Sequence, residues 1–384
     1  MEKLVQEQTP VQIFRDREKR RRFTRGSFYL RIGLLVLFLL VPFLFPSFKT
    51  VDLAIKIVIF ASLVASFDIL LGYTGILSFG HGMFFGIGAY CVAFLIGKYG
   101  SPSYLNLMLG LLIATAAAVI LALLISFISL RVKAIFFAMV TLALAELAIV
   151  LANKLTHFTG GEDGISISMP GIFSVAFNLG DFLGLDITGR VVTYYFILFS
   201  CLALFLMMLR FTNSPLGRVL QAIRDNEQRA VALGYKTFIF QTLSITFGCV
   251  LATLIGGLYA MWVRYVNPES SLEVMAIMLN VLLMVIIGGM GTLYGGIVGA
   301  AFLLITQTFL PDLQHIAKDL LPQATFLHNV LERWLLLFGI LFILVVIFFP
   351  KGVIGSVNEY FARRKQTQER DTRAYPIAAG AEPK

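Results

Sequence analysis

The sequence predicts an all-α, polytopic membrane protein with about ten transmembrane helices. Of its 384 residues, 58% are hydrophobic and 14% are charged, whereas soluble domains carry about 25% charged residues. Apolar stretches long enough to cross a bilayer recur along the chain. The basic residues, which give a formal net charge of +9, lie mainly at the two ends and in one loop. This distribution is typical of membrane proteins, whose cytoplasmic segments are positively charged.

The first element is a basic arm, residues 1–27, followed by an apolar run over residues 28–45. A cleaved signal peptide is not expected, because the basic region is long and no small-x-small cleavage site follows the run. We therefore expect a retained first span with its N-terminus in the cytoplasm. An RNA-binding basic arm is the less favoured alternative, since a charge run beside a span usually sets orientation.

Nine further apolar stretches follow. They are residues 53–71, 76–97, 105–130, 134–152, 191–209, 237–262, 274–288, 291–310 and 331–349. An even number of spans returns the C-terminus to the cytoplasm, in agreement with the basic cluster at residues 363–373. The stretch 274–288 is short for a full crossing, which suggests a broken helix or a re-entrant segment.

These stretches define a transmembrane domain over residues 28–355, followed by a cytoplasmic tail over residues 356–384. The tail is polar and then rich in Ala, Pro and Gly, so we expect it to be disordered. The longest external connection, residues 153–190, is mainly acidic. It suits a soluble partner outside the membrane, and a plain surface loop with a short interfacial helix is the other interpretation.

Two glycine-rich breaks interrupt the apolar stretches, at residues 72–82 and 288–296. Irregular backbone at membrane depth is tolerated only inside protein or beside a water-filled cavity, so a substrate path is one interpretation. Close packing of helices at small residues is the other. Gly72 and Gly75 of the first break align with Gly288 and Gly291 of the second. The alignment suggests a duplicated architecture with a parallel repeat.

The candidate path residues come from these breaks and from one charged side chain. They are Gly72, Tyr73, Thr74, Gly75, Ser78, His81, Glu146, Gly288 and Gly291. Glu146 lies well inside its span, where an ionisable residue is costly and normally faces the bundle interior. Asp68 and Lys56 lie nearer the ends of theirs, which favours contact with water or structural pairing. For His81 a substrate contact and a buried hydrogen bond to the backbone both remain open.

The cytoplasmic loop 210–236 is predicted to contain two short helices. Ser214 is a good N-cap and Pro215 suits the first position of a helix. Asn226 caps the second helix with Glu227 in its first turn, and Gly234 supplies a left-handed end.

The first of these helices has an apolar stripe at helical spacing, formed by Leu216, Val219, Leu220 and Ile223. We expect three arginines to point outward: Arg218, Arg224 and Arg229. Two interpretations fit such an element, which either docks in a groove of another protein or lies on the membrane surface.

No motif for a metal, a cofactor or a catalytic reaction is present. Gly97-Lys98 lacks the upstream glycine of a phosphate-binding loop. The three cysteines lie in apolar runs with no paired spacing and no nearby histidine, so neither a disulfide nor a metal site is expected. An enzyme is therefore poorly supported.

Four separated motifs, in the same order, resemble the LivM-type permease subunit of branched-chain amino acid ABC importers. They are Gly72 to Tyr90, Thr159 to Gly164, Gly217 to Arg229, and Gly288 to Gly295. The resemblance covers about residues 28–355 and implies a type II-like ABC importer permease in a bacterial cytoplasmic (inner) membrane. It also implies a second, LivH-like permease subunit, two cytoplasmic ATPases that bind the ATP, and an external or periplasmic substrate-binding protein. No cofactor and no nucleic acid are expected on this chain.

The resemblance further implies that Ser214 to Tyr235 dock on an ATPase. The residues expected to couple are Ser214, Pro215, Gly217, Arg218, Ala222, Arg224, Asp225, Asn226, Glu227, Arg229 and Gly234. Branched-chain or other neutral amino acids are the first substrate class, and urea or short amides are the alternative within the family. An ion-coupled secondary carrier, with Glu146 or Asp68 as the ion site, is the competing hypothesis. The family's fold implies an inverted repeat, which disagrees with the parallel alignment.

Overall fold

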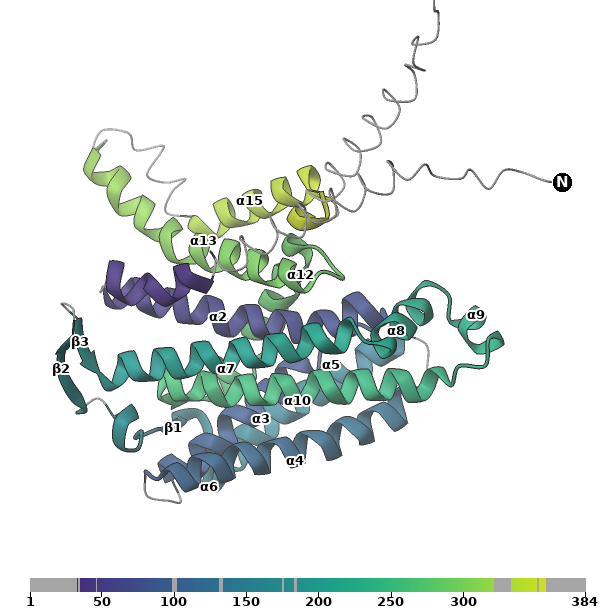
Figure 1. The fold of residues 1–384 in the computed structure, drawn as a ribbon, viewed down its shortest axis with the longest axis horizontal. Helices are drawn as coiled ribbons and strands as arrows, with labels where there is room; N and C mark the ends of the chain where they lie inside the picture. Colours follow the sequence, from purple (N-terminus) through teal and green to yellow (C-terminus); the bar gives the residue numbers. More distant parts are fainter. Residues whose placement is uncertain are drawn as a thin grey trace, which may run out of the picture.

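The computed structural model describes residues 33, 35–45, 47–98, 102–130, 134–174, 176–182, 185–320, 333–350 and 352–356. The N-terminal arm and almost all of the C-terminal tail lie outside this part, so the expectations for them remain predictions. Within it the chain is overwhelmingly helical (Figure 1). The predicted all-α membrane fold is confirmed.

Seven helices of the described part are long and apolar enough to cross a membrane. They are Phe48–Thr74, Tyr104–Ser129, Ile135–Lys154, Gly189–Thr212, Thr237–Val263, Leu293–Asp312 and Leu336–Ser356. In terms of elements, these are α2 (Phe48–Asp68) continued by η1 (Ile69–Thr74), α4 (Tyr104–Ser129), α5 (Ala134–Lys154), α7 (Gly189–Thr212), α10 (Thr237–Val263), α13 (Leu293–Leu320) and the segment that contains α15 (Trp334–Phe348).

Three shorter apolar helices complete the set: Leu35–Leu44, His81–Gly97 and Ile277–Gly288. The second consists of α3 (His81–Ala93) and most of η2 (Phe94–Lys98). The third combines the end of η5 (Val274–Leu279) with α12 (Asn280–Gly288). Each predicted span therefore coincides with an apolar helix, but a count of ten crossings remains a prediction.

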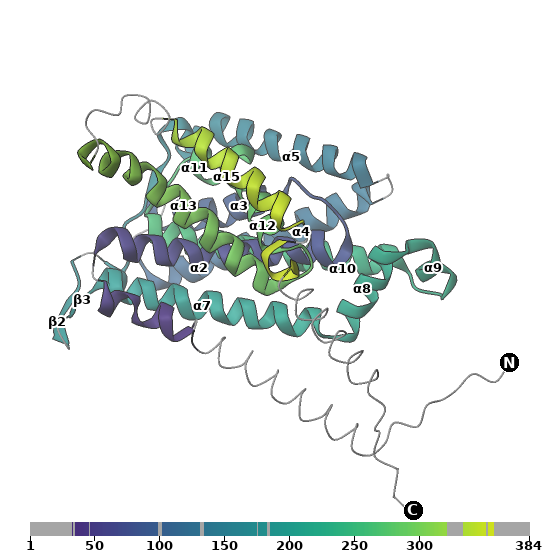
Figure 2. The ribbon, with the colours of Figure 1, turned by 90° about the horizontal axis from the view of Figure 1, so that it is seen from above.

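The helices run roughly side by side, and α2 lies in the middle of the bundle (Figures 1 and 2). In the most apolar stretch of each span, 78% of the residues are buried for Phe48–Thr74, which contains α2, and 28% for α5, which lies at one edge of the bundle.

Close packing between α3 and α10 occurs at glycines. A Cβ atom at Gly88 would overlap the Thr253 carbonyl, and a Cβ atom at Gly256 would overlap the Phe85 carbonyl. These glycines let the two backbones approach each other.

The connections that the sequence predicts to be external gather at one end of the bundle. There β2 (Asn178–Phe182) and β3 (Leu185–Thr188) form an antiparallel hairpin, and β1 (Ile165–Ser166) pairs with β4 (Tyr265–Val266). Short helices complete this end: α6 (Thr156–Thr159), η3 (Gly161–Asp163), η4 (Gly171–Phe173) and α11 (Pro268–Ser271). The strands were not predicted from sequence. The opposite end carries α8 (Pro215–Asp225) and α9 (Glu227–Ala232) (Figures 1 and 2).

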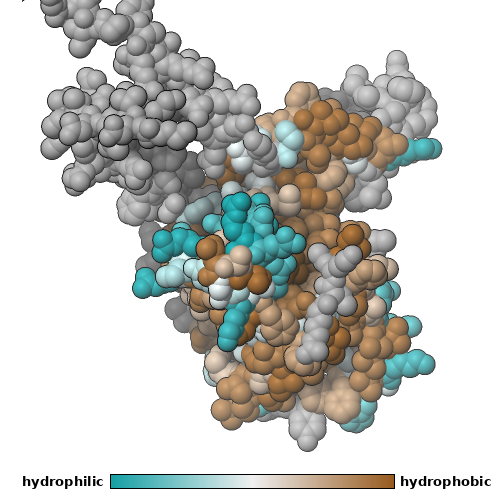
Figure 3. All heavy atoms as spheres, turned by 90° about the vertical axis from the view of Figure 1, so that its right-hand side faces the viewer, coloured by the Kyte–Doolittle hydropathy of each residue, from teal (hydrophilic) through white to brown (hydrophobic). Residues whose placement is uncertain are grey.

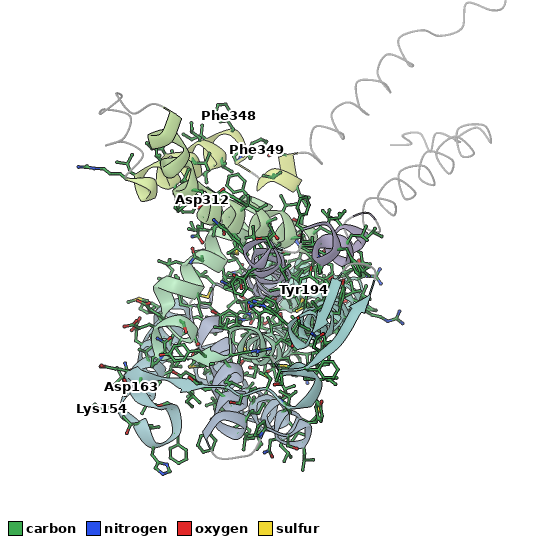
Figure 4. The ribbon with its side chains drawn as sticks, turned by 90° about the vertical axis from the view of Figure 1, so that its left-hand side faces the viewer. Lys154, Asp163, Tyr194, Asp312, Phe348 and Phe349 are labelled. Carbon is green, nitrogen blue, oxygen red and sulfur yellow. The ribbon has the colours of Figure 1, made fainter. Side chains whose placement is uncertain are left out.

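Polar contacts near the end that carries the strands join the helices to one another. Lys49 of α2 forms an ion pair with Asp312 of α13. Asp52 accepts a hydrogen bond from Trp262 Nε1 at 2.8 Å and pairs with Lys56 at 2.8 Å. Figure 4 shows the bundle from this end, with Tyr194 in the interior and Phe348 and Phe349 at the periphery. Lys56 is thus paired structurally, as the sequence favoured.

We expect Gly88→Ala to lower the midpoint of thermal unfolding of the purified protein in detergent. The added methyl group has no room beside the Thr253 carbonyl, and overpacking a core costs about 1–3 kcal/mol. Gly339→Ala on α15 is the matched control, because an added Cβ there meets no neighbour within 4 Å among the described residues. Equal midpoints for the two variants would contradict the close α3–α10 packing.

Candidate functional site at the two glycine breaks

The first break lies where α2 passes into the π-helix η1. The turn ends at Gly75, whose φ of 76° is in the left-handed region that favours glycine. Residues 75–80 have no regular helix, and α3 begins at His81. The predicted interruption is therefore present.

The second break separates α12 from α13. Gly289 and Gly291 have φ values of 108° and 79°, so both positions suit glycine. A Cβ atom at Gly288 would overlap the carbonyl of Gly295, which brings the two ends of the break into contact. Both predicted breaks thus have the irregular backbone that their sequences indicate.

The two breaks meet at Asp68. Its Oδ1 atom accepts a hydrogen bond of 2.8 Å from the backbone N–H of Gly291. Gly72 lies against this contact, since a Cβ there would overlap both Asp68 Oδ1 and Gly291 N. The Asp68 side chain is buried, and its Oδ2 atom has no hydrogen-bond partner among the described residues. Asp68 is therefore paired inside the protein rather than in contact with water.

Arg224 of α8 joins the same place. Its Nη1 atom donates a hydrogen bond to the carbonyl of Gly72, in the last turn of η1, where carbonyls lack a helical partner. Arg224 is exposed, as predicted, and its guanidinium group also reaches this carbonyl. Arg218 and Arg229 are exposed as well.

The caps of α8 and α9 lie where the sequence places them. Ser214 Oγ accepts from the N–H of Gly217 at 3.4 Å, and Asn226 Oδ1 accepts from the N–H of Arg229 at 2.9 Å. Gly234 follows α9 with a φ of 90°. The boundaries of both predicted helices are therefore confirmed.

The surface of this helix pair is mixed in character. Gly217 packs against the Thr212 carbonyl, while Ala222, Asp225 and Glu227 are exposed. In Figure 3, hydrophilic atoms gather around a few hydrophobic ones at this end, and most of the coloured surface beside them is hydrophobic. The pair therefore presents a polar surface beyond the apolar bundle.

Hydroxyl groups tie the first break to three neighbouring helices. Thr74 Oγ1 lies 2.8 Å from Ser244 Oγ of α10, and the N–H of Phe79 donates to Thr141 Oγ1 of α5 at 3.1 Å. Ser66 Oγ of α2 lies 2.8 Å from His81 Nε2. Sequence patterns did not single out these hydroxyl partners, because each pair joins residues on separate elements.

His81 is 1% exposed, and its Nδ1 atom has no partner among the described residues. The buried hydrogen bond that the sequence left open is present, but a Ser66 hydroxyl replaces the expected backbone group. Ser78 is also buried, and Tyr73 is half-buried. A substrate contact for these residues remains a prediction.

Glu146 lies apart from the breaks, on the exposed side of α5. It does not face the interior of this chain's bundle, as its position in the span had suggested. The apolar sequence of α5 gives no stripe from which the buried side could be read. A carboxylate is costly against lipid tails, so this face suits a partner chain or a water-filled path.

A cavity of about 560 Å³ lies between α3, α4 and α5. Its walls are almost entirely apolar, with Tyr90, Ser129 and Thr159 as the polar contributors and no charged side chain. None of the predicted path residues lines it. Among the residues that the structure describes, no cluster of three or more His, Cys, Asp or Glu side chains could hold a metal ion.

A bundle of apolar helices, two interrupted spans that meet inside it, and a capped helix pair at one end together define a multi-pass membrane permease. Residues 49–346 match the family described as branched-chain amino acid transport system / permease component. The chain belongs to this family. It is a permease subunit of an ABC importer and not an enzyme, and its transport system includes other subunits.

Individual relatives agree with this assignment. The high-affinity branched-chain amino acid transport system permease protein LivM of Escherichia coli (strain K12) is 30% identical over 337 residues, which are 84% of this chain and 74% of the relative. A probable branched-chain amino acid transport permease protein LivM of Methanocaldococcus jannaschii is 26% identical over 71% of this chain and 78% of its own. The autoinducer 2 import system permease protein LsrC of Photorhabdus laumondii is 36% identical over 24% of this chain and 28% of its own. No solved structure matches.

We expect Ser66→Ala to lower the midpoint of thermal unfolding, because the variant leaves the buried His81 ring without its hydrogen-bond partner. An unsatisfied buried polar group costs about 1–3 kcal/mol. Thr193→Val is the control, because that buried hydroxyl bonds to the Gly189 carbonyl of its own helix and no described side chain depends on it. Equal shifts in the two variants would contradict a structural role for the Ser66–His81 contact.

Proposed function

We propose that this permease imports branched-chain or other neutral amino acids across a bacterial cytoplasmic membrane, with ATP hydrolysed by separate subunits. The names of the Escherichia coli and Methanocaldococcus jannaschii relatives support the substrate class. Urea or short amides remain the alternative substrates within the family. ATP is the sole nucleotide required, and it is bound by the ATPases rather than by this chain.

The proposed complex has a second, LivH-like permease subunit, two cytoplasmic ATPases and an external substrate-binding protein. The loop 153–190 and the α8–α9 pair lie at opposite ends of the bundle (Figure 1). The first therefore suits the binding protein and the second the ATPases. Both chain termini are cytoplasmic in this arrangement, which also agrees with the positive charge near each end.

The observation that carries the proposal is the way α8 is attached. Its apolar side chains Leu220 and Ile223 are 1% and 3% exposed, so they pack in the protein and are not free to enter lipid. On α9 and just beyond it, Val231, Leu233 and Tyr235 are exposed. A firmly attached helix followed by an exposed apolar patch with polar surroundings fits a protein groove better than a membrane surface.

The solute path runs past the two glycine breaks and opens on the side of α8. Gly72 and Gly291 lie in contact there, and both are near Arg224. Glu146, exposed on α5, lies where a second permease chain would complete the path. Closure of the ATPases on ATP displaces α8, and this displacement shifts the breaks.

We expect Glu227→Lys to weaken binding of the ATPase subunit to the detergent-solubilised permease by about tenfold, or about 1.4 kcal/mol. Glu227 is exposed and bonds to Gln241 at 3.4 Å, so the spans should stay folded. Glu269→Lys, the same change at an exposed position on α11 at the other end, is the control. Equal ATPase affinities for both variants would end the docking proposal.

Transport by the reconstituted complex in vesicles tests the energy source and the substrate. With the binding protein and leucine outside and ATP within reach of the ATPases, we expect uptake that persists with an ionophore and stops with an ATPase-dead subunit. Uptake that needs an ion gradient instead of ATP would establish the ion-coupled carrier. Uptake of urea and not of leucine would support ATP as the energy source but would show that the substrates are urea or short amides.

A further inference from the structure

Three segments that are distant in the sequence meet at the Arg224 side chain. Its guanidinium donates to the Gly72 carbonyl of η1. A Cβ atom at Gly291, in the α12–α13 break, would lie 3.1 Å from Arg224 Nη1. One at Gly75 would lie 3.1 Å from Arg224 Cγ. The partly exposed side chain of Arg224 therefore contacts both breaks, and the left-handed backbone at Gly75 and Gly291 favours glycine at these contacts.

Asp68 offers a second acceptor at the same place. Its Oδ1 atom is used by the Gly291 N–H, but the buried Oδ2 atom has no hydrogen-bond partner among the described residues. Arg224 and Asp68 meet at Gly291, because Asp68 Oδ1 accepts from the Gly291 N–H and a Cβ atom at Gly291 would lie 3.1 Å from Arg224 Nη1. Since an unsatisfied buried acceptor is unfavourable, the free Oδ2 atom attracts a guanidinium with unused donors.

We propose that Arg224 is a positioning residue with two alternative acceptors, the Gly72 carbonyl and Asp68 Oδ2. Its transfer from one to the other carries a displacement of α8 to both glycine breaks. This inference rests on the proposed docking of α8 on an ATPase. It adds the contact through which that docking reaches the spans.

The two acceptors lead to different parts of the bundle. The Gly72 carbonyl belongs to η1 and so to the junction of α2 with α3. Asp68 holds the Gly291 N–H just before the N-terminus of α13, where a carboxylate also interacts favourably with the helix dipole. Each position of Arg224 satisfies one acceptor and releases the other, which is the property of a two-state element.

The test uses purified complete transporters in vesicles and measures solute imported per ATP hydrolysed. Because the ratio is measured on assembled complexes, weaker ATPase binding does not enter it. Arg224→Gln and Asp68→Asn should each lower the ratio by about tenfold, the factor expected for loss of a hydrogen bond to a charged group. Asparagine keeps an oxygen for the Gly291 N–H, so the fold of the break is retained.

The double variant shows whether Arg224 and Asp68 act together or independently. If Arg224 and Asp68 act as a pair, Arg224→Gln combined with Asp68→Asn should lower the ratio no further than either change alone. A multiplied loss of about a hundredfold means independent roles and overturns the proposal. An unchanged ratio in either single variant overturns it as well.

Arg224→Lys supplies a check that does not depend on altering the buried carboxylate. Lysine keeps the charge and reaches either acceptor with a single donor group, so it should recover at least half of the ratio lost in Arg224→Gln. Lysine no better than glutamine would overturn the proposal. Failure of this inference can be distinguished from failure of docking. Normal ATPase affinity of the Glu227→Lys variant refutes docking. Weakened ATPase affinity of Glu227→Lys, together with an unchanged transport ratio in Arg224→Gln, refutes the Arg224 switch alone.

Discussion

The structure depends on one constraint, that backbone polar groups within a bilayer must find partners inside the protein. Two spans break at glycines, and each break frees N–H and carbonyl groups that a continuous helix would have paired. Asp68 accepts from one of these N–H groups, at Gly291, and Arg224 donates to one of the carbonyls, at Gly72. The interruptions are tolerated because these two charged side chains take the place of helical partners.

The same constraint links the transport function to the partners that drive it. A break that needs an external side chain for its stability also responds when that side chain moves. Arg224 belongs to α8, which has its own N-cap at Ser214 and packs on the bundle through the buried side chains Leu220 and Ile223. This permease has no nucleotide-binding motif, so a movement of a partner subunit has to reach the spans through contacts such as that of Arg224 with Gly72.

Local features of this fold could be predicted from sequence, whereas contacts between distant elements could not. The caps at Ser214 and Asn226, the stop at Gly234 and the irregular breaks all follow from residue types at neighbouring positions. The contact of Arg224 depends on a carbonyl 152 residues away, and the Asp68 contact on an N–H 223 residues away. Glu146 was misjudged for a related reason, since α5 is apolar all round and only packing decides which side is covered.

The long central helix has a mechanical consequence of its own. Its α-helical part, Phe48–Asp68, has 21 residues and spans about 30 Å at 1.5 Å per residue, and η1 extends it to Thr74. Near one end Lys49 and Asp52 are tied to α13 and α10, and near the other Asp68 and Gly72 meet the second break and α8. Because these four residues belong to one helical segment, a force applied at its Gly72 end reaches the contacts with α10 and α13 at its other end.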